Sequence, residues 1–158
     1  ENNNQSQKMA NLIISEGLKN NLNEINGVEC CVYYPGLNGH GYAGTCDLLG
    51  VFDNINSVVD FKQKNSIMKE SYESLQTYFT QLGAYSLAAN TIYNANITQG
   101  VILLATTDLV FQIFKIKDEK LVEYQNKFLK RVEQYYSIIY KNWFPRQTLS
   151  TGKLPALM

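Results

Sequence analysis

The stretch GYAGTCDLLGVFDNINSVVDFKQKN, residues Gly41 to Asn65, decides the fold of this chain. It contains two runs of strand-forming residues, Tyr42 to Phe52 and a second run that includes Val58 to Phe61. The turn-forming residues Asp53-Asn54-Ile55-Asn56 separate the two runs. The pattern therefore predicts a β-hairpin.

Three charged residues lie in this hairpin, with Asp47 on the first strand and Asp60 and Lys62 on the second. Side chains alternate between the two faces of a strand, so Asp60 and Lys62 point the same way. If Asn54 and Ile55 form the tip of the hairpin, Asp47 faces Lys62 and Asp60 lies one diagonal step away. A slip of one residue in this register would place the two acids on opposite faces.

Two carboxylates held a few ångströms apart repel each other, so one must take up a proton or a cation must lie between them. Mg²⁺ suits such oxygen ligands and keeps positions open for water and phosphate. Lys62 could orient an attacking water or offset charge that develops on a phosphate. The alternative is a cross-strand ion pair between Asp47 and Lys62, with Asp60 in solvent.

The motif GTCD followed by VVDFK, with Asp60 placed 13 residues after Asp47, resembles the PD-(D/E)xK nuclease superfamily. The core residues of that family would be Asp47, Asp60 and Lys62. Downstream, Gln81-Leu82-Gly83-Ala84-Tyr85 resembles the QxxxY helix motif of the branch that includes the RecB nuclease domain and Cas4-like nucleases. The order of elements is most similar to the mitochondrial genome maintenance exonuclease and its phage and bacterial relatives.

The resemblance implies metal-dependent hydrolysis of phosphodiester bonds, with single-stranded DNA that has a free end as the substrate. It implies that Asp47, Asp60 and the backbone carbonyl of Phe61 hold one or two Mg²⁺ or Mn²⁺ ions. It places Gln81 beside the acids, where its amide can hold a carboxylate or a DNA phosphate. Tyr85 either belongs to this site or packs in the core while its hydroxyl finds a partner.

Three further residues are candidates for the site. Glu29 matches an acid that lies near the metal in relatives, as an outer ligand or by holding a metal-bound water, and the alternative is an ordinary exposed strand residue. Relatives supply a metal-binding histidine from an upstream helix that has no match here, so we expect that helix to precede Glu1. His40 is then a surface or substrate-contacting side chain, and Lys64 is a candidate contact to nucleic acid.

Length and composition predict one globular domain over residues 1–158, with 145–158 as a tail. The formal net charge is zero, which counts against an avid non-specific DNA binder. No apolar run is long enough to span a bilayer, so we expect no membrane partner. Because no cysteine follows Cys46, the cysteine arrangement of relatives with an iron–sulfur cluster is absent.

The three cysteines, Cys30, Cys31 and Cys46, are predicted to be buried free thiols in a reducing compartment. We therefore expect an intracellular protein, in a bacterial or phage-infected cytoplasm or in a mitochondrion.

The full pattern predicts an α/β fold, a central mixed sheet of about five strands flanked by helices, as in the restriction-endonuclease-like core. The apolar run Val101 to Leu104 indicates a central strand, and the next strand is predicted to be an edge. The expected elements are a helix Ser6–Ile25, strands Val28–Tyr34, Tyr42–Phe52 and one through Val58–Phe61, a helix Lys69–Tyr93, strands Gln99–Thr106 and Leu109–Ile116, and a helix from Asp118.

Three functions fit this chain. The first is a metal-dependent DNA exonuclease, and the second is an endonuclease or junction-cleaving enzyme on the same core. The third is a non-catalytic nucleic-acid-binding or scaffold module, which the intact set of Asp47, Asp60 and Lys62 argues against.

Overall fold

The computed structural model describes residues 4–143, so the expected tail 145–158 lies outside the described residues. The elements follow the chain as α1 (Gln5–Leu12), η1 (Ile13–Leu18), β1 (Leu22–Tyr34), η2 (Leu37–Gly39), β2 (Tyr42–Phe52), β3 (Ile55–Lys64), α2 (Glu73–Tyr93), β4 (Gln99–Thr106), β5 (Phe111–Lys117) and α3 (Asp118–Trp143).

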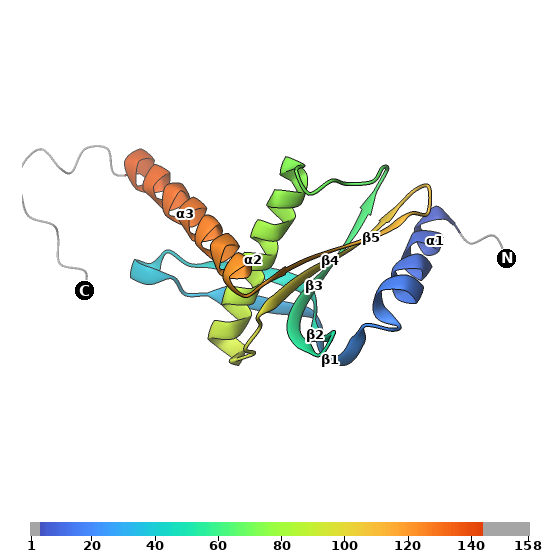
Figure 1. The fold of residues 1–158 in the computed structure, drawn as a ribbon. Helices are drawn as coiled ribbons and strands as arrows, with labels where there is room; N and C mark the ends of the chain where they lie inside the picture. Colours follow the sequence, from blue (N-terminus) through green and yellow to red (C-terminus); the bar gives the residue numbers. More distant parts are fainter. Residues whose placement is uncertain (1–3, 144–158) are drawn as a thin grey trace, which may run out of the picture.

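One mixed five-stranded sheet forms the centre of the molecule, in the order β1-β2-β3-β4-β5. β3 and β4 are parallel, and the other neighbouring pairs are antiparallel. Parallel neighbours need a crossover connection, which α2 supplies between β3 and β4. The predicted α/β class, with a mixed sheet flanked by helices, is confirmed (Figure 1).

The sheet carries a hydrophobic cluster on each face. On one face, side chains of α2 and α3 such as Leu82 and Leu121 pack on the sheet. On the other face, Met9 and Ile13 of the first helical segment cover it. Figure 1 shows α1 on one side of the strands and α2 and α3 on the other. Every residue of β4 is buried, so the predicted central strand is confirmed, and β5 is an edge as expected.

The helix predicted over Ser6–Ile25 is helical through Leu18 and wrong at its end, because Leu22 to Ile25 belong to β1. η1 is a π-helical turn that lies tight on β4: a Cβ on Gly17 would be 2.9 Å from Leu103 Cδ1. The Asn21 amide then donates to the Gly17 carbonyl at 2.8 Å. Helical periodicity in the sequence did not reveal that this segment leaves the helix to pair with β2.

The hairpin tip also differs from the expected one. Phe52 pairs with Ile55, so Asp53 and Asn54 form a two-residue turn. Both turn residues have positive φ, 51° and 63°, as tight hairpins between twisted strands require. The register is displaced by two positions from the expectation, so Asp47 comes level with Asp60 and not with Lys62.

The β1–β2 ribbon extends past α2 and packs on α3 (Figure 1). Tyr42 packs edge-on against Phe128 with ring centroids 4.7 Å apart, and the Tyr136 hydroxyl donates to the Gly41 carbonyl at 2.8 Å. Tyr135 of α3 points to solvent and is 62% exposed. Tyr136 faces the ribbon in its place.

The prediction of buried thiols holds for one residue of the three. Cys46 is buried, Cys30 is half-buried and Cys31 is exposed, and all three are free. Between Asn4 and Trp143, the model contains no helix that is both long and apolar enough to cross a membrane.

Candidate active site

The two strands of the hairpin, β2 and β3, separate at Asp47. The last paired residues of β2 and β3 on this side are Leu48 and Val59. One position further, the Asp47 carboxylate accepts a hydrogen bond from the backbone N–H of Phe61 at 2.8 Å. The side chain thus replaces a backbone carbonyl as the acceptor for β3, and the carboxylate lies in the gap between the strands.

The side chains of β2 also change from one face of the sheet to the other at this point. Cys46 packs in the cluster under α2, whereas Leu48 packs in the cluster under α1, on the opposite face of the sheet. Residues two apart on a regular strand share a face, so the strand must twist sharply at Asp47. On the neighbouring strand, Glu29 has a positive φ of 49° at the same level. The simple alternation used in the sequence analysis does not hold across this twist.

Asp60 is the buried acid of the pair, with 3% of its surface exposed. Burial raises the pKa of Asp60, the nearby Lys62 opposes this rise, and the charge of Asp47 adds to it. The Lys62 ammonium lies 2.6 Å from Asp60 Oδ2. Among the described residues, however, no donor meets that oxygen in a regular hydrogen bond. Lys62 is therefore the partner of this oxygen as an ion pair, and a carboxylate has further lone pairs that can take a second ligand.

Lys62 is held from three sides. Besides the contact with Asp60, its Nζ donates to Gln81 Oε1 at 3.3 Å and lies 4.7 Å from the centre of the Tyr78 ring. The Gln81 amide in turn donates to the Tyr85 hydroxyl at 2.8 Å. A chain of contacts thus runs from Asp60 through Lys62 and Gln81 to Tyr85.

α2 positions this chain because Tyr78, Gln81 and Tyr85 lie on successive turns of one side of the helix. The Tyr85 ring packs on β2 at Gly44, where a Cβ would lie 2.9 Å from Tyr85 Cε1. A residue without a side chain at position 44 is what lets α2 approach this closely. The ring fixes the hydroxyl that orients Gln81.

The structure places the other candidates elsewhere. Lys64 lies with its Nζ 5.2 Å from the Tyr78 ring centre, next to the site. Glu29 is exposed, and it does not form with Asp47 and Asp60 a group of side chains placed to hold a metal ion. His40 packs on α3: its ring stacks on Tyr136 with centroids 4.5 Å apart, and its Nδ1 lies 2.8 Å from Glu133 Oε2.

The acids can be tested as a metal site from their chemistry. Within residues 4–143, no group of three or more His, Cys, Asp or Glu side chains is placed to hold a metal ion. Mg²⁺, however, is commonly held by one or two carboxylates, with water and phosphate in the other positions. Asp60, whose carboxylate has lone pairs beyond the one paired with Lys62, and the Asp47 carboxylate, whose charge acts on it, fit that kind of open site.

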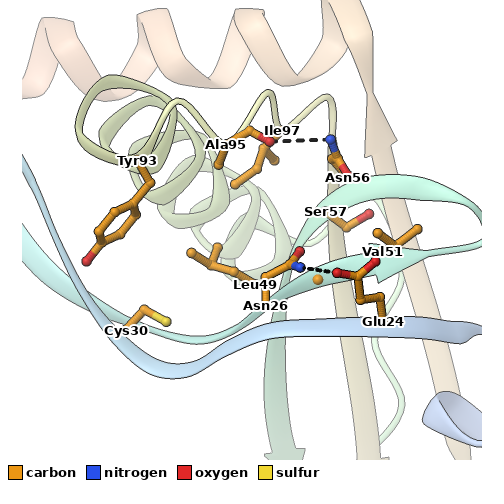
Figure 2. Close-up of a pocket in the computed structure, with 11 residues that line it drawn as sticks. Glu24, Asn26, Cys30, Leu49, Val51, Asn56, Ser57, Tyr93, Ala95 and Ile97 are labelled. Atoms are coloured by element: carbon orange, nitrogen blue, oxygen red, sulfur yellow. Dashed lines mark hydrogen bonds between the residues drawn. The ribbon is translucent and has the colours of Figure 1, made fainter.

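A cavity of about 640 Å³ does not include this site, and Figure 2 shows the residues that line it. They come from β1 between Glu24 and Cys30, the last residues of β2 before Phe52, the start of β3, the end of α2 and the loop after it. None of the residues that line it is a lysine or an arginine, and none belongs to the chain from Asp60 to Tyr85. The candidate catalytic side chains therefore lie at the strand separation and outside this cavity.

The sequence analysis did not include Tyr78 among the candidate site residues. The structure leaves it half-buried under two lysine side chains. Its position three residues before Gln81 was the available signal, because residues three apart are neighbours on a helix surface.

No protein-family model matches the sequence. No curated protein matches it. Among solved structures, the crystal structure of a "Putative exonuclease" from Eubacterium rectale superposes with a TM-score of 0.63 over 97% of this chain, at 15% sequence identity. The likeness shows a shared fold. This chain spans 62% of the length of that protein. The structure of SSO0001 is less similar, with a TM-score of 0.47, 18% identity and coverage of 82% of this chain and 59% of that chain.

Proposed function

We propose that this chain carries the catalytic core of a metal-dependent deoxyribonuclease of the PD-(D/E)xK type, acting as an exonuclease on single-stranded DNA with free ends. One observation carries the proposal. Asp47 accepts from the Phe61 N–H where β2 and β3 separate, close enough for its charge to act on Asp60, and Lys62 contacts both Asp60 and Gln81 there. Two acids can hold a divalent metal that activates water for phosphodiester hydrolysis, and a lysine beside them can offset the charge that develops.

In the proposed mechanism, Asp47, Asp60 and the Phe61 carbonyl hold Mg²⁺ or Mn²⁺. When bound, the metal lowers the pKa of a water and draws charge from the phosphate oxygens. Lys62 sits 2.6 Å from Asp60, where its ammonium can orient the attacking water or offset the charge of the transition state. Gln81 keeps Lys62 in place, and Tyr85 holds the Gln81 amide in the required orientation.

The exonuclease named among the structural neighbours agrees with this assignment, although the proposal stands on the residues of this chain. Metal dependence, the preference for single strands and the need for a free end are parts of the proposal that cleavage assays address directly. An endonuclease on the same core would cut a closed circle, and an exonuclease would not.

The test uses the full-length protein with Mg²⁺ or Mn²⁺, linear single strands labelled at either end, and closed circular single strands. We expect loss of the linear strands from an end, intact circles and no cleavage in EDTA. Lys62→Ala should lower the rate about 100-fold or more while the fold persists, because removing one preorganised charge from a transition state costs that much. The matched control is Lys127→Ala, since Lys127 pairs with Glu123 at 2.6 Å on the surface of α3.

Cleaved circles would replace the exonuclease with an endonuclease. Full activity of Lys62→Ala would contradict the role given to this lysine. If the full-length protein cleaves nothing with either metal, the chain is a binding or scaffold module.

A further inference from the structure

The Tyr78 ring holds two lysines beside the acids. Lys62 Nζ lies 4.7 Å from the ring centre and Lys64 Nζ lies 5.2 Å from it. Both distances fall in the range of cation–π attraction, which is worth about 0.5–1 kcal/mol at exposed sites and more where water is excluded. Tyr78 is half-buried and packs against the core cluster, so its ring is a fixed support.

The two lysines differ in what else they contact. Lys62 is engaged by Asp60 and Gln81. Lys64 has no acidic partner among the ion pairs of the described residues, and the Tyr78 ring is the contact that holds its ammonium. A cation that is positioned but not neutralised is available to an anion.

Geometry sets the spacing of this pair. Alternate residues on a strand are about 6.7 Å apart and point to the same side, which is the scale of one nucleotide step in an extended strand. Both ammonium groups lie near one ring, so the distance between them cannot exceed the sum of their distances to the ring centre. Two phosphates that follow each other along a single strand fit this arrangement.

We infer that Lys64, supported by Tyr78, binds the phosphodiester next to the one that is cleaved, and that Tyr78 is a positioning residue that fixes the spacing between Lys62 and Lys64. The inference rests on the proposed function and deepens it. It names as ligand a single-stranded nucleic acid with at least two successive phosphates.

The first experiment compares two substrates that differ in phosphate number. Thymidine 5′-(p-nitrophenyl phosphate) has a single phosphodiester, and oligothymidylate has many. We expect Lys64→Gln to raise KM about 5–10-fold on the oligonucleotide, with kcat within twofold, and to leave both constants unchanged on the ester. The dependence of log affinity on log salt for the oligonucleotide should become shallower by about 0.7, the loss of one phosphate contact.

Lys127→Gln is the matched control. Lys127 also lies over a tyrosine, with Nζ 4.3 Å from the Tyr124 ring centre, but on α3 and paired with Glu123. Its replacement should leave KM and the salt dependence unchanged. Equal effects of the two substitutions, or an equal rise of KM on both substrates with Lys64→Gln, would overturn the inference.

The second experiment addresses Tyr78 without relying on catalysis. The tyrosine ring should shift the ε-methylene proton resonances of Lys62 and Lys64 upfield. Tyr78→Phe should keep these shifts and the kinetic constants, and Tyr78→Leu should lose the shifts and raise KM on the oligonucleotide as Lys64→Gln does. Retained constants in Tyr78→Leu after the shifts have been lost would remove the positioning role.

Failure of the proposed function can be told apart from failure of this inference. Oligonucleotide affinity is measured by fluorescence anisotropy in Ca²⁺, which supports binding without requiring cleavage. If the wild-type protein cleaves nothing but Lys64→Gln weakens this binding and the salt dependence becomes shallower, the contact stands and the enzyme assignment falls. If neither affinity nor salt dependence changes, the contact itself is wrong.

Discussion

Replacing Asp60 with asparagine should make the metal-free protein more stable and catalytically inactive. Asp60 is 3% exposed, and burial raises its pKa although Lys62 opposes the rise. A carboxyl whose pKa is raised by folding holds its proton more tightly in the folded state. Its contribution to stability is fully present below pH 3.8, the ordinary value, and is lost as the pH rises through the raised pKa.

The magnitude follows from this linkage. At neutral pH, each unit by which folding raises the pKa of Asp60 costs about 1.4 kcal/mol of folding free energy. Asparagine has nearly the same shape and carries no charge, so this cost is absent from the variant. Lys62 loses an ion pair but keeps Gln81, the Tyr78 ring and partial access to water, since its side chain is 19% exposed. For a domain of this size, each kcal/mol gained raises Tm by about 2–4 °C.

Thermal unfolding followed by circular dichroism in EDTA, from pH 4 to pH 8, measures this effect. The variant should gain stability over the wild type as the pH rises, and the two should converge toward pH 4. Asp53→Asn is the control, because Asp53 pairs with Lys115 where both side chains are about one-third exposed, and such pairs contribute little. A variant less stable than the wild type at pH 8 would show that the ion pair outweighs the cost of burial, and the reasoning would fail.

Metal addition completes the same experiment. A ligand that binds only the folded state at 100 times its Kd adds about 2.7 kcal/mol to stability. Mn²⁺ should therefore raise the Tm of the wild type and reverse the order of the two proteins. An equal shift in Asp60→Asn would show that the metal binds elsewhere.

Three other substitutions and modifications test the surroundings of the site. Gly44→Ala should cost about 1–3 kcal/mol and lower the cleavage rate at least about tenfold, because the new methyl group displaces the Tyr85 ring; unchanged kinetics would contradict this. Burial raises the pKa of Cys46 to about 12, so a thiol reagent at pH 8 should label the exposed Cys31 first. Peptide mass spectrometry reads the labelling, and rapid labelling of Cys46 in the folded protein would contradict this prediction. His40→Ala should cost about 0.5–1.5 kcal/mol through lost stacking on α3 but keep the Mn²⁺-induced rise in Tm, whereas loss of that rise would make this histidine a ligand.

The fold was largely predictable because its strongest signals are local. The apolar run Val101 to Leu104 is typical of a strand whose sheet is covered by helices on both faces, and it lies in β4, which is fully buried. The first helix was not predictable to its end, since the segment from Leu22 joins β1 through contacts with β2 that are distant in the sequence. Tertiary pairing overrode the local helical pattern there.

The proximity of some candidate residues was predictable, but the geometry of the hairpin was not. Spacing within β3 and α2 brought Asp60, Lys62 and Gln81 together as expected. The expected facing of Asp47 toward Lys62 was wrong because the turn takes two residues with positive φ and displaces the register by two positions. A displacement by two residues leaves each side chain on the same face of its strand, so Asp47 and Asp60 still come level with each other. The twist at Asp47 depends on the separation of β2 from β3, and the alternation of side chains between the two faces of a strand does not predict that separation.

The neutral composition of the chain is consistent with a site for a polyanion once the local charges are counted. Asp47 and Asp60 carry two negative charges at the strand separation, and Lys62 and Lys64 carry two positive charges beside them. Without a metal these charges cancel, so the site has little attraction for a phosphate backbone. On the proposed function, a divalent ion between the acids cancels their charge, and the two lysines on the Tyr78 ring then face the strand unopposed. Affinity for nucleic acid would in this way depend on the bound metal, and a strongly basic surface is not needed.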